Sequence, residues 1–387
     1  MYLIPVHLTN SFVLAVIAIY LPVMVRYLGY SASLVGIILA ISEGAGILGP
    51  FLICRFTDRN GKYKQSLIFS AILSALPALP LALLGQPLLS AVFVAIIAVG
   101  YRSSTPLIEA ITTINVGKSG NYGKIRVFGS IGFVAFSLFM QWVPILKRDG
   151  PLNIALWIVI TSIFSIAVIS FLPSQSINVE PRNAEAPVGD SPHNKNKKSI
   201  WTSYFILGLI CIALNRLAMA PIYSFLSLFM VEYMHWDAVG IIWAVGSTAE
   251  IPFLYISHHL IRRFGSMPVL VFTSVMAVLR LLLYAVFPFK AGIIFAQLLH
   301  SFCFGLFHPA AVTFISESVP LEKRSFGMTI YLSLGNGLPL LVGNFAGGFI
   351  VEYLGFRSLF GTFLIFPLLS VLIYFAGRFK GIFGLSR

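Results

Sequence analysis

Six charged side chains lie inside long apolar stretches of this sequence, where charge is costly. Three are acids and three are arginines: Glu43, Glu109, Glu250, Arg102, Arg216 and Arg280. An ionised side chain at the centre of a membrane helix costs about 2.5–3.5 kcal/mol when it faces lipid. Six such charges therefore have to face one another or a water-filled cavity, and a functional role is the first hypothesis for each.

Their positions predict two constellations. Arg102 and Glu109 are seven residues apart, which on one helix places them on the same face, about 10.5 Å apart along the axis. They share a cavity, but at that separation each needs another partner. The second constellation joins Glu250, Arg280 and His300, which come from successive apolar segments.

The second constellation suits proton transfer. A carboxyl in an apolar cavity favours its neutral form, whereas a nearby arginine favours the charged form. Movement of the arginine away from the acid therefore makes the acid bind a proton. Glu250 and Arg280 are our candidates for proton coupling, with Glu109 as a further acid; a static structural role is the alternative interpretation of these charges. His300 adds an imidazole that titrates near neutral pH or hydrogen-bonds a substrate.

Other residues suit substrate binding. Arg102 and Arg216 favour an anionic solute, because a guanidinium pairs bidentately with a carboxylate. His308 and Asn336 are further candidates, with packing and interhelical hydrogen bonding as the alternative interpretations; Glu43, among glycines, is expected to hydrogen-bond across a helix interface. The chain carries no nucleophile, metal-ligand or ATP-binding motif. We therefore expect no enzyme, no metal and no cofactor.

The elements that position these side chains are predicted to be membrane helices. The 387 residues are 58% hydrophobic and 10% charged, with a mean hydropathy of +0.91. Apolar stretches of about 20 residues, enough to cross ~30 Å of hydrocarbon, recur along the chain. They lie near residues 4–28, 32–54, 65–85, 88–113, 125–146, 152–172, 201–231, 238–261, 266–288, 291–316, 325–351 and 355–377. The sequence therefore predicts an all-α membrane protein with about twelve transmembrane helices.

A polar segment divides the chain into two halves. Residues 173–200 are rich in Pro, Asn and Ser and end in a lysine cluster, which is typical of a flexible linker. Residues 1–172 and 201–387 then form an N-terminal and a C-terminal six-helix bundle. LVGII at 34–38 recurs as AVGII at 238–242, and other loops match at the same offset of 204 residues. We therefore expect two pseudo-symmetric bundles that rock about a site near the middle of the membrane.

The distribution of Lys and Arg predicts the orientation. Positive charge near helix ends is retained on the cytoplasmic side, and 18 of the 26 basic residues fall on the side of the linker. Both termini are then cytoplasmic, and the protein lies in the inner membrane. The net charge of +13 is a topology signal and does not indicate nucleic-acid binding. The first apolar run lacks the features of a signal peptide and is expected to remain as the first span.

One charged loop carries a family motif. The stretch RFTDRNGKYK places Asp58, Arg59, Gly61 and Lys62 between two apolar runs. These residues resemble the loop signature of the major facilitator superfamily. The resemblance implies the fold of that superfamily, and it implies that Asp58 belongs to a contact that latches one face of the transporter closed.

The resemblance extends beyond this loop. Cys54 stands where the signature has a glycine, and Tyr63 replaces a basic residue. The segments STPLIEAIT, NYGKIRVFGSIGFV and QLLHSFCFGLFHPAAV look like the branch that contains the phenylpropionate permeases, whose relatives include lactose and nucleoside proton symporters. The placement of Glu250, Arg280 and His300 resembles the one by which lactose-permease relatives couple proton and sugar movement.

These observations predict a secondary active transporter that imports a small organic solute with a proton, and an aromatic carboxylate such as a phenylpropionate is favoured. A sugar or nucleoside symporter and an uncoupled facilitator or exporter are alternatives within the class. A membrane sensor that binds ligand without moving it is the alternative from another class. The expected partners are the solute, the proton and the lipid bilayer, without nucleic acid. We expect a monomer, because two repeats already enclose a site.

Overall fold

Helices account for all the regular structure in the described part of the chain. The computed structural model describes residues 3–116, 122–143, 149–172, 200–320 and 323–382. The N-terminal half contains α1 (Leu3–Tyr27), α2 (Ala32–Asn60), α3 (Tyr63–Ala75), α4 (Ala78–Leu84), α5 (Pro87–Val116), α6 (Tyr122–Trp142) and α7 (Pro151–Ser170).

The C-terminal half interrupts several of its α-helices with short π-helical segments, labelled η. It contains α8 (Ser203–Leu228), η1 (Phe229–Tyr233), α9 (Val239–Phe264), α10 (Ser266–Val286), α11 (Lys290–Leu298), η2 (Ser301–Leu306), α12 (Phe307–Ser318), α13 (Arg324–Ile330), η4 (Tyr331–Gly337), α14 (Leu338–Phe363) and α15 (Ile365–Phe379).

Eleven helical segments of the described residues are long and apolar enough to cross a membrane. The last of them, Phe326–Phe379, has 54 residues, which is about 80 Å of helix and more than twice the thickness of a hydrocarbon core. Gly355 lies within it at φ 80° and ψ 171°, outside the helical region, and separates two crossings. The described residues therefore supply twelve crossings of a multi-pass membrane protein, as the sequence predicts.

Two helix ends show the internal repeat. Gly61 ends α2 with φ 64°, and Gly265 ends α9 with φ 87°. The two glycines are 204 residues apart, the offset found in the sequence. Positive φ is readily adopted only by glycine, so both halves use the same residue to stop equivalent helices. This correspondence agrees with two pseudo-symmetric bundles.

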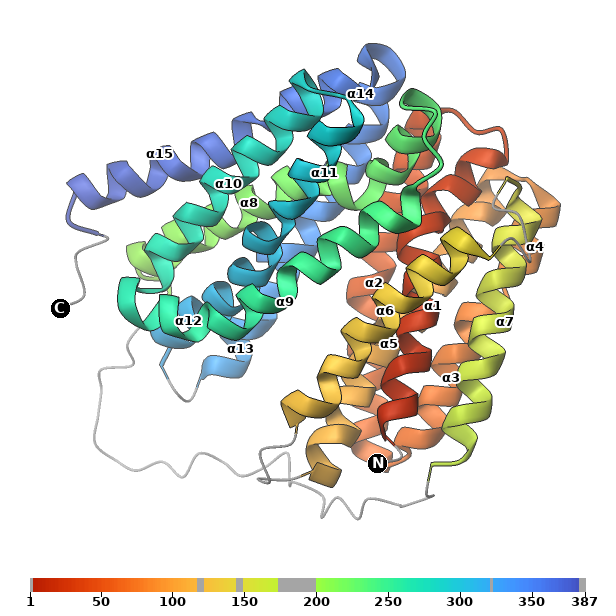
Figure 1. Ribbon diagram of the computed structural model, residues 1–387. Helices are drawn as coiled ribbons and strands as arrows, with labels where there is room; N and C mark the ends of the chain where they lie inside the picture. Colours follow the sequence, from red (N-terminus) through yellow and green to blue (C-terminus); the bar gives the residue numbers. More distant parts are fainter. Residues whose placement is uncertain (1–2, 117–121, 144–148, 173–199, 321–322, 383–387) are drawn as a thin grey trace.

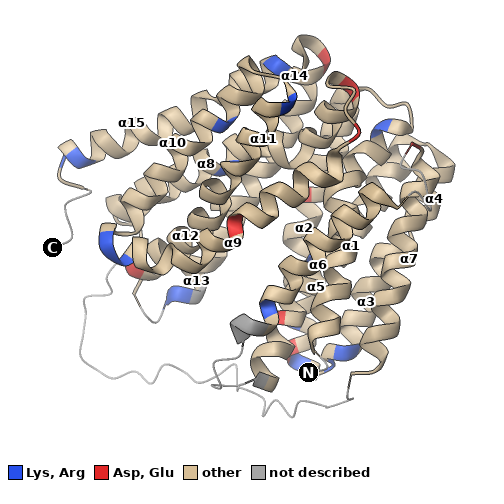
Figure 2. Ribbon diagram, viewed as in Figure 1, with Lys and Arg blue, Asp and Glu red and all other residues tan. Residues whose placement is uncertain are grey.

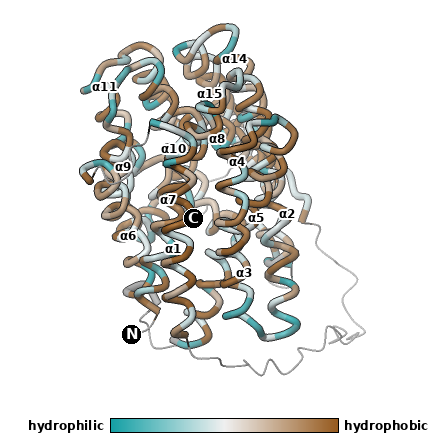
Figure 3. Tube along the Cα trace, turned by 90° about the vertical axis from the view of Figure 1, so that its right-hand side faces the viewer, coloured by the Kyte–Doolittle hydropathy of each residue, from teal (hydrophilic) through white to brown (hydrophobic). Residues whose placement is uncertain are grey.

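The two halves lie side by side and meet near one end (Figure 1). Helix α2 packs against α14, α6 against α9, and α1 against α8. Hydrophobic residues dominate along the helices, whereas hydrophilic stretches gather towards the helix ends and turns (Figure 3). The predicted linker lies outside the described residues except for Ile200, so the domain limits at 172 and 201 stay a prediction.

One close approach between the halves depends on glycines. A Cβ on Gly36 of α2 would lie 2.6 Å from the carbonyl oxygen of Asn344 and 2.7 Å from Cα of Gly348, both on α14. Small residues allow helix backbones to approach this closely within a membrane. The α2 and α14 pair therefore joins the halves through backbone contact, at the end of the molecule opposite the N-terminus.

We predict that Gly36→Ala separates α2 from α14, because the added methyl group has no space. Spin labels attached to cysteines at the exposed positions Leu88 and Tyr353, in a background without the native cysteines, would report a longer distance across this end. Gly44→Ala is the matched control on the same helix, since its Cβ would meet only Leu341, at 3.4 Å. An unchanged distance in Gly36→Ala would contradict the prediction.

Candidate functional site

The C-terminal half brings the second predicted constellation together. Nε2 of His300 lies 3.3 Å from Oε2 of Glu250 on α9, and Nδ1 of His300 lies 3.0 Å from Nη1 of Arg280 on α10. The other terminal nitrogen of Arg280 donates to Oε1 of Gln297 on α11 at 2.5 Å. All four side chains are buried. They form one chain of polar contacts across three helices.

Hydrogen-bond roles fix the tautomer of His300 in this chain. A guanidinium only donates, so Nδ1 of His300 has to accept from Arg280. The neutral imidazole then carries its proton on Nε2 and donates that proton to Glu250. While Arg280 occupies Nδ1, the histidine has no free nitrogen for a further proton. Glu250, which accepts the Nε2 proton of His300 in a hydrogen bond, is the carboxyl group of these contacts.

Arg216 forms a second buried centre nearby. This residue of α8 is only 3% exposed. Its guanidinium donates to the carbonyl oxygen of Cys303 at 2.9 Å and to the hydroxyl of Tyr223 at 3.1 Å, and it lies 3.7 Å above the ring of Phe307. Its Nε is buried without a hydrogen-bond partner. The contacts described for this cation are neutral groups, and a carboxylate is not among them.

The segment η2 links the two centres. His300 directly precedes it, and its residue Cys303 offers the carbonyl oxygen that Arg216 contacts. Pro309 follows shortly after and has no N–H for the carbonyl of Gly305 four residues earlier, which weakens the regular α-helical pattern here. A rotation of η2 would therefore change both centres together.

A row of rings runs along the same segment. The ring centres of His300 and Phe304 are 5.5 Å apart, and those of Phe304 and His308 are 6.3 Å apart. Because these residues are four apart in sequence, they stack on one helix face. His308 ends the row at Tyr331, with Nδ1 3.2 Å from the hydroxyl oxygen. This contact supplies the packing partner that the alternative interpretation of His308 requires, and the binding role stays a prediction.

The N-terminal half pairs its charges differently. Arg102 of α5 forms an ion pair with Glu43 of α2 and donates from Nε to the hydroxyl of Tyr101 at 2.8 Å. Gly46 makes room for this arginine, since a Cβ there would collide with its side chain. Arg102 therefore does not pair with Glu109, in line with the separation expected from the sequence.

Glu109 finds its partner on the next helix. Its Oε1 lies 3.4 Å from Nε of Arg126 on α6, and both side chains are at least one-third exposed. The sequence interpretation did not identify Arg126 or Gln297 as members of a site. Their type and spacing gave no signal, because each is recognisable only by the charge that packs against it.

The remaining predicted residues are Asn336 and those of the charged loop. Asn336 is half-buried on η4. In the charged loop, Asp58 accepts a hydrogen bond from the hydroxyl of Tyr63 at 2.7 Å, within its own half. Arg59 and Lys62 are exposed, and Gly61 caps α2. The latch role of this loop stays a prediction.

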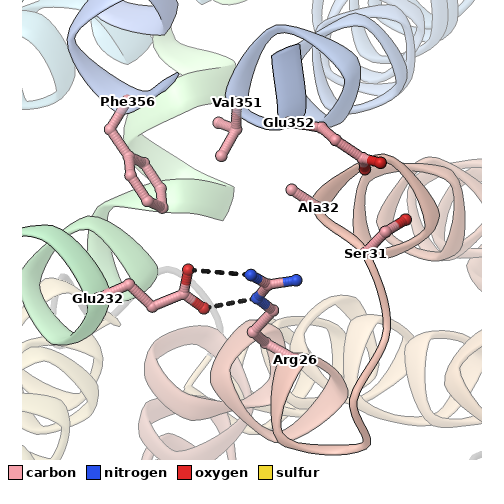
Figure 4. A pocket seen from close by; sticks show the side chains of 7 residues that line it. All are labelled: Arg26, Ser31, Ala32, Glu232, Val351, Glu352 and Phe356. Atoms are coloured by element: carbon pink, nitrogen blue, oxygen red, sulfur yellow. Dashed lines mark hydrogen bonds and ion pairs between the residues drawn. The ribbon is translucent and has the colours of Figure 1, made fainter. Parts of the chain in front are cut away.

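The end where the halves meet carries a polar contact of its own. Arg26 at the end of α1 pairs with Glu232 of η1, with distances of 2.6 Å from Nε and 3.3 Å from Nη2 (Figure 4). Beside this pair, Glu352 of α14 accepts a hydrogen bond at 2.7 Å from the backbone of Ser33 in the first turn of α2. Together they surround a cavity of about 350 Å³.

Most charged residues lie near the helix ends (Figure 2). The buried centres are the exceptions, since Arg102, Arg216 and Glu250 each lie about midway along their helices. Charges held at mid-depth mark the pathways of ions or substrates in membrane proteins.

Comparison with known proteins identifies a matching family and similar transporters. The model of the MFS_1 like family matches residues 11–362. The chain is 27% identical over 255 residues to the uncharacterized transporter YwbF of Bacillus subtilis, covering 65% of this chain and 60% of that protein. It is 22% identical to the maltose permease of Geobacillus stearothermophilus, over 82% of this chain and 78% of the permease.

A protein named for the predicted branch also matches, over a smaller share of the chain. The probable 3-phenylpropionic acid transporter of Escherichia coli is 23% identical over 61% of this chain and 60% of its own length. The solved structure of a mutant of the nucleoside transporter NupG superposes with a TM-score of 0.80 at 18% identity and covers 99% of both chains. This structural similarity confirms the predicted fold.

The pair of Glu43 and Arg102 yields a stability prediction. Glu43→Leu leaves the guanidinium without its counter-ion, and we expect a loss of about 3 kcal/mol. Arg102→Leu should cost less, because an orphaned carboxyl is able to take up a proton and a guanidinium is unable to release one. The double variant should recover most of the stability. Thermal unfolding in detergent compares the stabilities of the wild type, the two single variants and the double variant. A double variant whose loss equals the sum of the two single losses would contradict the prediction.

The pair of Arg26 and Glu232 yields a conformational prediction. Both side chains are about one-third exposed, so the pair contributes up to about 1 kcal/mol. Arg26→Gln should shift the population several-fold towards separation of this end, as measured by labels at Leu88 and Tyr353. The exchanged pair Arg26→Glu with Glu232→Arg should restore the wild-type distance. Failure of the exchanged pair to do so would mean that the contact does not hold the halves together.

Proposed function

The chain belongs to the MFS_1 like family of the major facilitator superfamily, and on that premise we propose that it is a proton-coupled symporter of a small organic anion. Aromatic carboxylates are the favoured substrates. The proposal assigns Glu250 as the proton site, and Arg280 and His300 as its partners. Arg216 is the cation that attracts the substrate.

One observation carries the choice of an anion. In the described C-terminal half, two buried guanidiniums, Arg216 and Arg280, accompany a single buried carboxylate, Glu250. His300 is neutral in the tautomer derived above, so one positive charge is left over. An uncompensated charge in a low-dielectric interior is costly. An anionic substrate beside Arg216 supplies the missing charge.

The surroundings of Arg216 favour an aromatic group on that anion. Phe307 lies under the guanidinium, and the row from His300 through Phe304 to His308 runs along the same stretch of chain. Rings of this kind stack on an aromatic substrate. The similarity to the probable 3-phenylpropionic acid transporter supports the same class. Arg102 is a weaker candidate, because Glu43 already neutralises it.

Proton coupling follows from the same groups. When Glu250 takes up a proton, the local excess of positive charge grows, and an anion binds more strongly. When the proton leaves, the carboxylate competes with the anion for the cations. Proton and anion therefore bind together and leave together, as symport requires. Glu109, paired with Arg126, is the further acid that the proposal retains.

The orientation is part of the proposal. The basic loop at residues 55–64 and the N-terminal end of α1 lie opposite the end where the halves meet. With those basic loops in the cytoplasm, both termini are cytoplasmic, and the contact of Arg26 with Glu232 closes the outer face of an inner-membrane protein. A monomer is sufficient, because every residue assigned to the site comes from one chain.

A neutral solute is the second candidate. The similarity to a maltose permease and the likeness to a nucleoside transporter favour a sugar or a nucleoside. In that case Arg216 supports η2 without meeting the substrate. Binding of maltose or uridine would then survive Arg216→Gln, whereas binding of 3-phenylpropionate would have no measurable strength.

We predict that Glu250→Gln abolishes uptake driven by a proton gradient and retains exchange of labelled 3-phenylpropionate across proteoliposomes, because exchange needs no net proton movement. Arg216→Gln should weaken 3-phenylpropionate binding roughly 10- to 100-fold, since a charge-assisted hydrogen bond is lost. Arg216→Lys keeps the charge but lacks the planar guanidinium. Its affinity for 3-phenylpropionate should therefore lie between that of the wild type and that of Arg216→Gln.

Two controls sharpen this experiment. Glu317→Gln removes an acid that bonds Ser266 away from both centres, and it should behave as wild type. Vesicles without protein set the baseline, because a protonated aromatic acid crosses lipid unaided. Proton movement with maltose or uridine alone would favour the second candidate. Equilibration without proton movement would indicate a facilitator or exporter, and binding without transport a sensor.

A further inference from the structure

Gln297 is a buried polar residue that the proposed function has not yet used. It lies on α11 and is only 1% exposed, within the apolar sequence KAGIIFAQL. A buried amide is costly unless it is hydrogen-bonded. Its Oε1 accepts from Nη2 of Arg280 at 2.5 Å, which offsets that cost and suggests what the residue does.

Arg280 is held from two sides. One terminal nitrogen contacts Nδ1 of His300 at 3.0 Å, and the other donates to Gln297. The guanidinium is planar, so two contacts at separate nitrogens fix both its position and its plane. Without the carbonyl of Gln297, the remaining contacts of the terminal nitrogens, with Nδ1 of His300 and with Sδ of Met219 at 4.0 Å, both lie at Nη1 and leave the plane of the guanidinium unfixed.

The position of Arg280 decides the state of His300. While the arginine donates to Nδ1, the histidine is restricted to the tautomer with the proton on Nε2, which faces Glu250. A rotated arginine frees Nδ1, and the histidine then exchanges tautomers or takes up a proton itself. The proton site would move from Glu250 to His300.

Close packing around Gln297 restricts the positions of its side chain and of His300. A Cβ on Gly246 of α9 would lie 3.3 Å from Oε1 of Gln297 and 3.4 Å from Cδ2 of His300. Gly246 stands one turn before Glu250, so its missing side chain lets α9 bring that acid up to the histidine. Further ionisable groups around the site, among the described residues, are Arg216, Tyr284, Cys303 and His308.

We propose that Gln297 is a positioning residue, which holds Arg280 against Nδ1 of His300 and thereby keeps the proton site on Glu250. This inference rests on the proposed proton coupling for its purpose, but its geometry is testable without any substrate. In this proposal, a neutral side chain of α11 determines whether the proton binds to Glu250 of α9 or to His300.

The first test is nitrogen NMR of protein labelled with ¹⁵N-histidine. The chain has seven histidines, and the signal of His300 is assigned by its loss in His300→Gln. Wild type should show the single neutral tautomer with the proton on Nε2. Gln297→Met keeps the side-chain volume but removes the acceptor, and it should show mixed tautomers or a doubly protonated ring. Gln297→Glu keeps the acceptor oxygen and should restore the single tautomer.

Two results overturn the inference: a wild-type His300 spectrum in Gln297→Met, or a proton on Nδ1 in wild type. If Gln297→Met does not fold, Gln297→Asn replaces it, because its amide is one methylene too short to reach Arg280 and the same loss is expected. Transport adds a second readout. Proton-driven uptake of 3-phenylpropionate should fall about tenfold in Gln297→Met relative to exchange. A wild type without proton-driven uptake would contradict the proposed function alone, since the NMR result is independent of it.

Discussion

The cost of charge in a hydrocarbon interior is the constraint on which the rest of this structure depends. Glu43 meets it through a direct ion pair with Arg102, and Glu109 through Arg126. Glu250 meets it indirectly, through an imidazole that separates it from Arg280. A direct pair is stable in one protonation state. A cation that lies one imidazole away stabilises the charged carboxylate less than a directly paired cation does. This arrangement is the one expected of a group that has to bind and release a proton.

The repeat provides the scaffold, and departures from it provide the chemistry. Gly61 and Gly265 end equivalent helices 204 residues apart. At the same offset, Glu250 corresponds to Gly46, whose missing side chain admits Arg102. One structural position thus carries a carboxylate in one half and space for a guanidinium in the other. Equivalent positions of the two halves therefore differ in charge, which the fold alone does not require.

The sequence predicted the helices and the meeting of Glu250, Arg280 and His300, because hydropathy fixes the spans and the family resemblance brings those spans together. It did not predict Gln297 as their partner. An uncharged amide in an apolar helix gives no sign in the sequence that it pairs with a buried charge. Which residue it contacts depends on how α11 is rotated against α10. The π-helical turn after His300 adds a rotation that regular helical spacing does not give.

The two ends of the molecule also differ in what holds them. Arg26 and Glu232 join the halves at one end, whereas Asp58 at the other end bonds Tyr63 of its own half. In the proposed cycle, a rocking movement breaks the first contact and frees Asp58 for a partner across the gap. Exposed pairs of this kind are worth about 1 kcal/mol or less, so the contact of Arg26 with Glu232 by itself favours the closed end only weakly. Under the proposed function, a proton on Glu250 and an anion beside Arg216 shift the balance between the two states, because each favours one state over the other.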